Sequence, residues 1–176
     1  MSRSATNPIL PRLIDPRKFA QQGLNLSGEV KLSELQRVSA LVLDDSSGVR
    51  VVLEFIVDEE RHRIISGSAD CVLKVTCQRC LEPVDVPVSA TLKLAIVWDE
   101  DGARQLPKTL DPLILGEGQA DLYTIIEDEL LLSLPMASYH PEDCIAQTSF
   151  GEEVEESTNS ANPFQVLEQL KGSPKS

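Results

Sequence analysis

The chain has 176 residues, of which 41% are hydrophobic, 25% are charged and only 4% are aromatic, so aliphatic side chains have to build its core. This composition excludes a wholly disordered protein, and no apolar run reaches the ~20 residues that cross a bilayer. Residues 1–11 lack the continuous apolar segment of an export signal, so we expect a cytoplasmic protein whose cysteines are reduced.

The formal net charge of −12 is unevenly distributed along the chain. Residues 1–108 hold 14 Lys/Arg against 15 Asp/Glu, a net −1, whereas residues 109–176 hold 2 against 13, a net −11. The acidic part disfavours phosphate backbones, which proteins bind largely through Lys and Arg. It favours a basic partner, such as a ribosomal or assembly protein, and we expect residues 109–171 to make that contact. Solvation of an acidic tail explains the charge equally well.

The first 40 residues predict two short helices and a strand. Asp15 can cap a helix that begins at Pro16 and ends at Gly23, where a left-handed residue is favourable. A capping-box pattern at Ser33–Gln36 predicts the second helix. Between them, apolar residues at even spacing are typical of a half-buried strand. These residues are Leu24, Leu26, Val30 and Leu32.

A two-residue period over Val49–Trp98 is the strongest structural signal. Three runs of alternating apolar side chains are joined by a charged turn at Asp58–Arg63 and by a short link that contains Cys77 and Cys80. Short links with no helical period between the strands predict an antiparallel β-meander. The two cysteines would then lie at a hairpin tip.

The chain after this sheet predicts one further helix. Asp99–Gly102 ends the meander, and Leu106–Leu115 is expected to be a loop followed by a short edge strand. Asp121 can cap a helix over Leu122–Leu134, which should pack its apolar side against the sheet. Glu127–Glu129 would form the solvated side of this helix, because contiguous carboxylates on a helix point in different directions.

The predicted fold class is therefore α+β, with a single domain over residues 1–149. Residues 150–176 follow as an acidic flexible linker and a short terminal helix over Asn162–Lys171. A short helix beyond a flexible linker usually docks, either on its own domain or on a partner.

Cys77 and Cys80 form the most specific local motif. A Cys-x-x-Cys link offers two thiolates to Zn²⁺, and a closed structural site needs four N or S ligands. His140 and Cys144 could complete a Cys₃His set. Two readings stay open with equal weight: this zinc site, or free thiols at the tip with the other two residues in an unrelated loop.

Catalysis is the least favoured interpretation of these residues. A thioredoxin-like pair needs its first cysteine at a helix N-terminus, whereas strands flank Cys77 and Cys80. Cys71 lies on the inward side of its strand and is expected in the core. His62 lies in a charged turn, and the sequence holds neither a nucleophile elbow nor a phosphate-binding glycine loop. We therefore expect a protein that is not an enzyme.

Three segments in a fixed order carry a resemblance to a known family. They are Cys77–Pro83 between two strands, Asp121–Pro135 leading to His140 and Cys144, and the terminal Asn162–Lys171. Together they resemble the bacterial YceD family, the large ribosomal RNA subunit accumulation proteins. The resemblance implies a role in synthesis, processing or stability of 23S ribosomal RNA, and it implies no catalytic residues. The alternatives are a zinc-stabilised interaction module and a small thiol-redox protein that uses Cys77 and Cys80.

Overall fold

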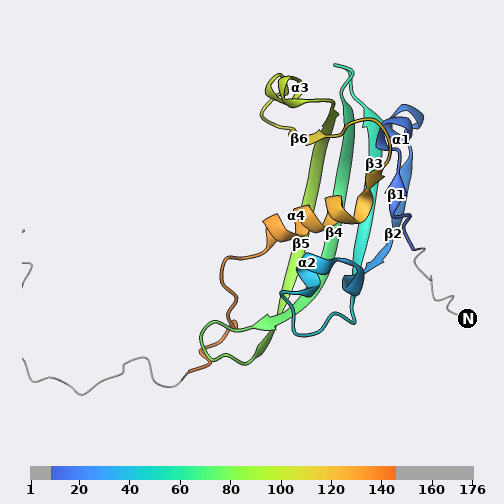
Figure 1. Cartoon of the computed structure of the whole chain (residues 1–176). Coiled ribbons are helices and arrows are strands. Elements are labelled where there is room, and N and C mark those ends of the chain that lie inside the picture. The colour runs from blue at the N-terminus through green and yellow to red at the C-terminus, as the bar shows by residue number, and fades with distance from the viewer. Residues whose placement is uncertain (1–8, 146–176) are drawn as a thin grey trace, which may run out of the picture. The chain divides into compact units, whose positions relative to one another are not determined.

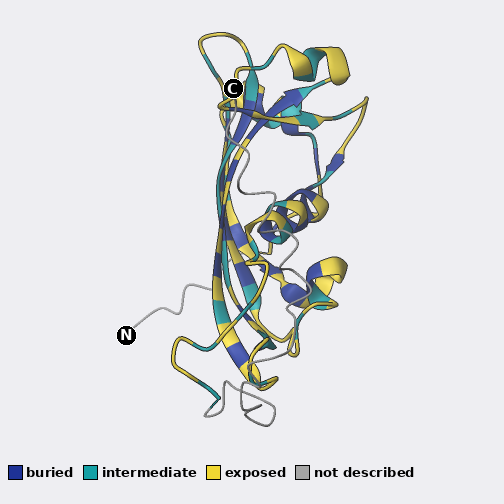
Figure 2. Cartoon of the chain, turned by 90° about the vertical axis from the view of Figure 1, so that its left-hand side faces the viewer, coloured by how far each residue is buried: buried dark blue, intermediate teal, exposed yellow. Residues whose placement is uncertain are grey.

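The structure is a computed structural model, and it describes residues 9–145. A five-stranded sheet forms one layer, with helices on one side of it (Figures 1 and 2). None of the helices in the described range is long and apolar enough to cross a membrane. The elements in chain order are β1 (Leu13–Ile14), α1 (Pro16–Gln22), β2 (Asn25–Lys31), the 3₁₀ turn η1 (Leu32–Glu34), α2 (Gln36–Ser39), β3 (Gly48–Val57), β4 (Arg63–Thr76), β5 (Pro83–Val97), α3 (Glu100–Arg104), β6 (Asp111–Ile114), β7 (Ala120–Asp121) and α4 (Leu122–Ser133).

The meander predicted over Val49–Trp98 is confirmed as β3, β4 and β5, and the strand predicted before it, β2, extends the same sheet. The sheet order is β2-β3-β4-β5-β6, and each pair from β2 to β5 is antiparallel. The edge strand β6 pairs with β5 in parallel over Leu94–Val97. The link that contains α3 lets the chain re-enter the sheet in the same direction, and neither α3 nor this parallel pairing was predicted. The fold class is α+β.

Helix α1 has the ends that its sequence predicts. The Asp15 carboxylate accepts from the Lys18 backbone N–H at 3.1 Å, and Gly23 ends the helix in the left-handed region with φ 63°. The helix packs on β3, where Phe19 meets Phe55 edge-on with ring centroids 5.4 Å apart. This contact closes the core over the first half of the sheet.

Helix α4 forms at its predicted position and packs against β5 and β4 (Figure 1). It ends at Ser133, one residue short of the predicted end, because Leu134 is extended before Pro135. The predicted apolar side is confirmed as the packed side, with Leu134 partly buried. Its buried members are Leu122, Ile125, Ile126 and Leu130.

Two predictions about the first half of the chain and α4 are wrong. No capping box forms at Ser33–Gln36, since the chain makes a 3₁₀ turn there and α2 begins after Leu35 without a side-chain cap of its own. Glu127 is not solvated: it is 7% exposed and accepts from the backbone N–H groups of Arg37 at 2.6 Å and Val38 at 3.2 Å. Helix α2 is thus capped by a carboxylate from α4.

Trp98 lies outside the core, although the two-residue period of its strand suggests a buried position. Its side chain is 56% exposed, and the Arg17 guanidinium stacks on the ring at 3.6 Å from the centroid. Arg17 also donates to the Gly116 carbonyl at 2.9 Å and to the Leu115 carbonyl. The sheet has ended at this point, so the ring packs on α1 instead of entering the core.

The predicted linker and terminal helix, residues 150–176, lie outside the described residues. The domain boundary at residue 149 stays a prediction.

Candidate metal centre

The link between β4 and β5 presents Cys77 and Cys80 at a hairpin tip, as predicted. The Cys77 backbone N–H donates to the Glu82 carbonyl at 2.9 Å, and the Leu81 N–H donates back to the Cys77 carbonyl at 3.0 Å. To close this turn, Leu81 adopts the left-handed region with φ 65°. The turn places both thiols on one side of the tip.

The segment after α4 supplies the other two candidate ligands. The chain leaves the direction of the helix at Pro135 and then runs to the hairpin tip (Figure 1). There the Gln78 N–H donates to the Ser138 carbonyl at 2.8 Å, and Arg79 pairs with Asp143 at 3.2 Å. These contacts hold His140 and Cys144 against the cysteine pair.

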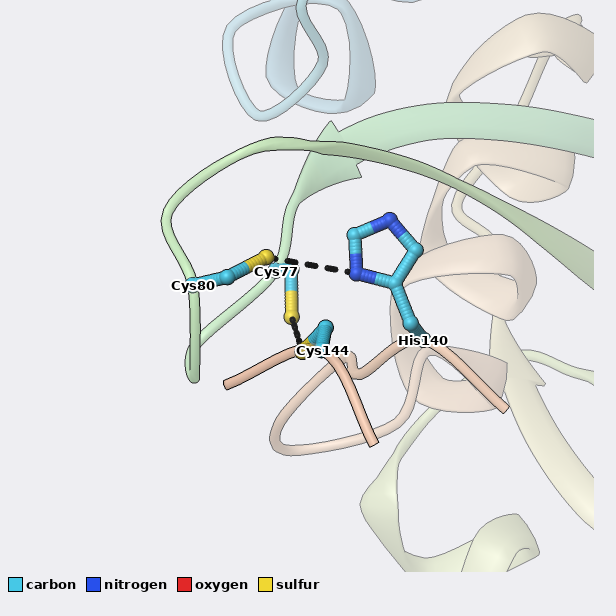
Figure 3. Close-up of side chains that lie close together, drawn as sticks. All are labelled: Cys77, Cys80, His140 and Cys144. Atoms are coloured by element: carbon cyan, nitrogen blue, oxygen red, sulfur yellow. Dashed lines mark hydrogen bonds between the residues drawn. The ribbon is translucent and has the colours of Figure 1, made fainter. Parts of the chain in front are cut away.

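The structure brings all four predicted residues together, as Figure 3 shows. Their ligand atoms lie within 4.8 Å of one another. A tetrahedral zinc ion with Zn–S bonds of ~2.3 Å would separate two sulfurs by ~3.8 Å and a sulfur from a nitrogen by ~3.6 Å. The distances are 3.7 Å between Cys77 Sγ and Cys144 Sγ, and 3.3 Å between Cys80 Sγ and His140 Nδ1. The donor set therefore fits Zn²⁺.

The hydrogen bond made by His140 Nε2 determines which ring nitrogen carries the hydrogen and which can accept from the cluster. His140 Nε2 lies 3.1 Å from the Pro83 carbonyl oxygen, which can only accept, so Nε2 carries the hydrogen. Nδ1 then has a free lone pair directed toward the sulfurs. Metal-bound histidines commonly donate their other N–H to a carbonyl or carboxylate, which fixes the ring.

The thiols of the cluster differ in acidity. Burial opposes the Cys77 thiolate, but backbone N–H groups of Cys80 and Arg79 hydrogen-bond to it and lower the pKa of Cys77 to about 5. Burial raises the pKa of Cys144, and the neighbouring sulfurs of Cys80 and Cys77 raise it further. Cys77 is thus the first of this pair to ionise, and a thiolate is the form that binds metal.

The other cysteine and the other histidine of the chain, and the buried Glu127, lie apart from this cluster. Cys71 is half-buried against the main core, and burial with the nearby Asp70 carboxylate raises the pKa of its thiol to about 11. His62 lies in the β3–β4 turn, with Nδ1 2.9 Å from Asp58. Glu127 was missed as a structural group, although it lies one turn from both Tyr123 and Leu130, which are buried.

The chain is similar to known proteins over a range that includes this site and extends beyond it. The family model described as Large ribosomal RNA subunit accumulation protein YceD matches residues 65–171, which include all four clustered residues. The chain belongs to the YceD family. A Haemophilus influenzae protein named Large ribosomal RNA subunit accumulation protein YceD is 34% identical over 167 residues, covering 92% of this chain and 96% of its own length. No solved structure matches this chain.

Proposed function

We propose that this chain is a non-enzymatic, cytoplasmic factor that supports the accumulation of 23S ribosomal RNA and thus of the large ribosomal subunit. The observation that carries the proposal is the similarity to the Haemophilus influenzae protein of that name, which spans 92% of this chain. Family membership over the segment that holds the clustered residues supports the same role.

In this proposed role, the Cys₃His cluster acts as a structural zinc site. Cys77 and Cys80 belong to the β4–β5 tip, while His140 and Cys144 follow α4, so one ion would tie two remote segments together. A bound zinc ion would cross-link these two segments, and it has no redox chemistry of its own. Four protein ligands would leave no open position for a substrate, which favours a structural over a catalytic site.

A basic ribosomal or assembly protein is the partner that we propose, with contact through residues 109–171. This region carries 13 of the 28 acidic residues of the chain and one of its 16 basic ones. Complementary charge accelerates encounter and is screened by salt, with a Debye length of about 8 Å at physiological ionic strength. We therefore propose binding that weakens as salt rises.

The proposal is tested by ribosome profiles of cells that lack the protein, complemented with the full chain or with Cys77→Ser. Loss of the protein should lower 23S RNA and free large subunits, and the full chain should restore both. Normal profiles without the protein would refute the role in accumulation. Tight binding of the purified protein to naked RNA would instead refute the mechanism through a basic protein.

Thiol-redox activity is the second candidate, and the low pKa of Cys77, about 5, is the observation that favours it. An acidic thiol suits catalysis and metal binding alike. Neither Cys77 nor Cys80 lies at a helix N-terminus, since strands flank their link on both sides. Turnover of a disulfide substrate by the reduced protein would support this alternative, and metal-dependent protection of the thiols would oppose it.

A further inference from the structure

Two thiols of the cluster that are in contact come from segments that are remote in sequence. Cys77 Sγ and Cys144 Sγ are 3.7 Å apart and 67 positions apart in the chain, whereas the Cys80 sulfur faces His140 (Figure 3). All cysteines of the described residues are free. A disulfide needs the sulfurs at about 2.0 Å, a short approach from this separation. We propose that hydroperoxides oxidise Cys144 and Cys77 to a disulfide, which makes the cluster a redox-sensitive metal site.

Of the two sulfurs in this pair, Cys144 is the more accessible to an oxidant. Cys77 is 0% exposed, whereas Cys144 is partly exposed. A cavity of about 430 Å³ lies beside Cys144, and Cys80 and His140 also line it. A small oxidant can therefore reach the Cys144 sulfur. Cys77, in contact with that sulfur from the interior, is placed to complete the disulfide.

The chemistry needs one molecule of hydroperoxide for each disulfide. The proton of the Cys144 thiol passes to the adjacent Cys77 sulfur, 3.7 Å away. The Cys144 thiolate then attacks one peroxide oxygen, the O–O bond breaks, and a sulfenic acid forms as hydroxide leaves. The Cys77 thiol then attacks the oxidised sulfur, an S–S bond forms, and the S–O bond breaks. The oxygen leaves as water with the thiol proton. Two electrons have passed from the sulfurs to the peroxide.

The disulfide would change the site without releasing the two segments from each other. Cys80 and His140 would remain as ligands, half of the four that a structural zinc site requires, so bound zinc should be released. The bond between Cys77 and Cys144 would still tie the β4–β5 tip to the segment after α4. A Cys77–Cys80 disulfide would instead leave these segments untied.

Peptide mapping of the full chain tests this choice of partner. Trypsin cleaves after Lys74, Arg79 and Lys93, so Cys77 and Cys80 fall on different peptides, and Cys144 falls on a third, residues 109–171. Zinc-loaded protein treated with hydrogen peroxide should yield peptide 75–79 cross-linked to peptide 109–171. Zinc release should rise in step with this product, and Cys71 should stay reduced.

Two variants serve as controls: Cys144→Ser should abolish the cross-link, and Cys71→Ser should leave it unchanged. A predominant Cys77–Cys80 link, retention of zinc after disulfide formation, or over-oxidation of Cys144 without a disulfide would each overturn the inference. The mapping can be repeated on metal-free protein, where the same cross-link is expected. The disulfide inference does not depend on the proposed role in ribosomal RNA accumulation. A failure of the inference can therefore be distinguished from a failure of the proposed role.

Discussion

Glu127 on α4 caps the N-terminus of α2 and at the same time holds the Arg37 side chain. One carboxylate oxygen accepts from the backbone N–H groups of Arg37 and Val38, and the other lies 2.9 Å from Arg37 Nε. Asp128, the next residue, pairs with the same guanidinium at 2.7 Å. Adjacent carboxylates therefore converge on one arginine although only one of them is buried, which joins two helices that are 90 positions apart.

Glu127→Gln should destabilise the fold, because the amide keeps one acceptor oxygen but loses the charge opposite Arg37. Removing one partner of a buried, charge-assisted hydrogen bond costs about 1–3 kcal/mol. Asp128→Asn is the matched control, since both members of that pair are about half exposed and such pairs contribute about 0–1 kcal/mol. Urea unfolding of both variants measures the difference, and equal losses would contradict the capping role.

Gly67→Ala should destabilise the sheet. Gly67 has φ 153°, and a Cβ atom there would lie 2.0 Å from the Val52 carbonyl oxygen. The clash and the unfavourable backbone conformation together should cost about 1–3 kcal/mol. Gly116→Ala is the control, since nothing lies within 4 Å of a Cβ at that position. Thermal unfolding should separate the two variants, and an unchanged midpoint for Gly67→Ala would be contrary to the described register.

Leu81→Gly should stabilise the metal-free protein. Leu81 has φ 65° and is 73% exposed, so glycine would relieve the left-handed conformation and lose little burial. The expected gain is about 1 kcal/mol, the lower end of the usual cost of this conformation. Leu132→Gly, in a residue 81% exposed within α4, should instead lose about 1 kcal/mol of helix propensity. Chemical denaturation of both variants checks the opposite signs.

The stability of the metal-free protein should depend on pH through Cys77. The folded pKa is lowered from 9.0 to about 5, so this thiol contributes stability that is complete above the unfolded value. That contribution falls as pH falls from 9 toward 5, and it is lost below the folded value. Cys77→Ser should therefore show a flatter pH profile than the unchanged chain over this window, measured by urea unfolding. Parallel profiles would contradict the lowered pKa.

Local patterns predicted most of the fold. The alternation in β3, β4 and β5 and the caps Asp15 and Asp121 follow from neighbouring residues, and the structure has all of them. The cap on α2 could not be predicted in this way, because its acceptor, Glu127, comes from another helix. The parallel pairing of β6 likewise depends on how a loop crosses the sheet end. Both features arise from tertiary contacts.

The candidate site was predicted as a set of residues but not as an arrangement. The Cys-x-x-Cys link and its place at a hairpin tip follow from the strand period around Cys77. Nothing local determines whether a residue 60 positions from Cys80 approaches it, so the zinc site and free thiols remained equal alternatives. The hydrogen bond from His140 to the Pro83 carbonyl, which orients Nδ1, depends on the folded backbone.

The central structural claim is a Cys₃His zinc site that joins the hairpin tip to the segment after α4. X-ray absorption spectroscopy of the zinc-loaded full chain tests it most directly, together with the metal content per chain. We expect one zinc per chain with three sulfurs at ~2.3 Å and one nitrogen at ~2.0 Å. Cys80→Ser should abolish this spectrum, and Cys71→Ser should preserve it. A protein that binds no zinc, or a spectrum with fewer than three sulfur ligands, would contradict the claim.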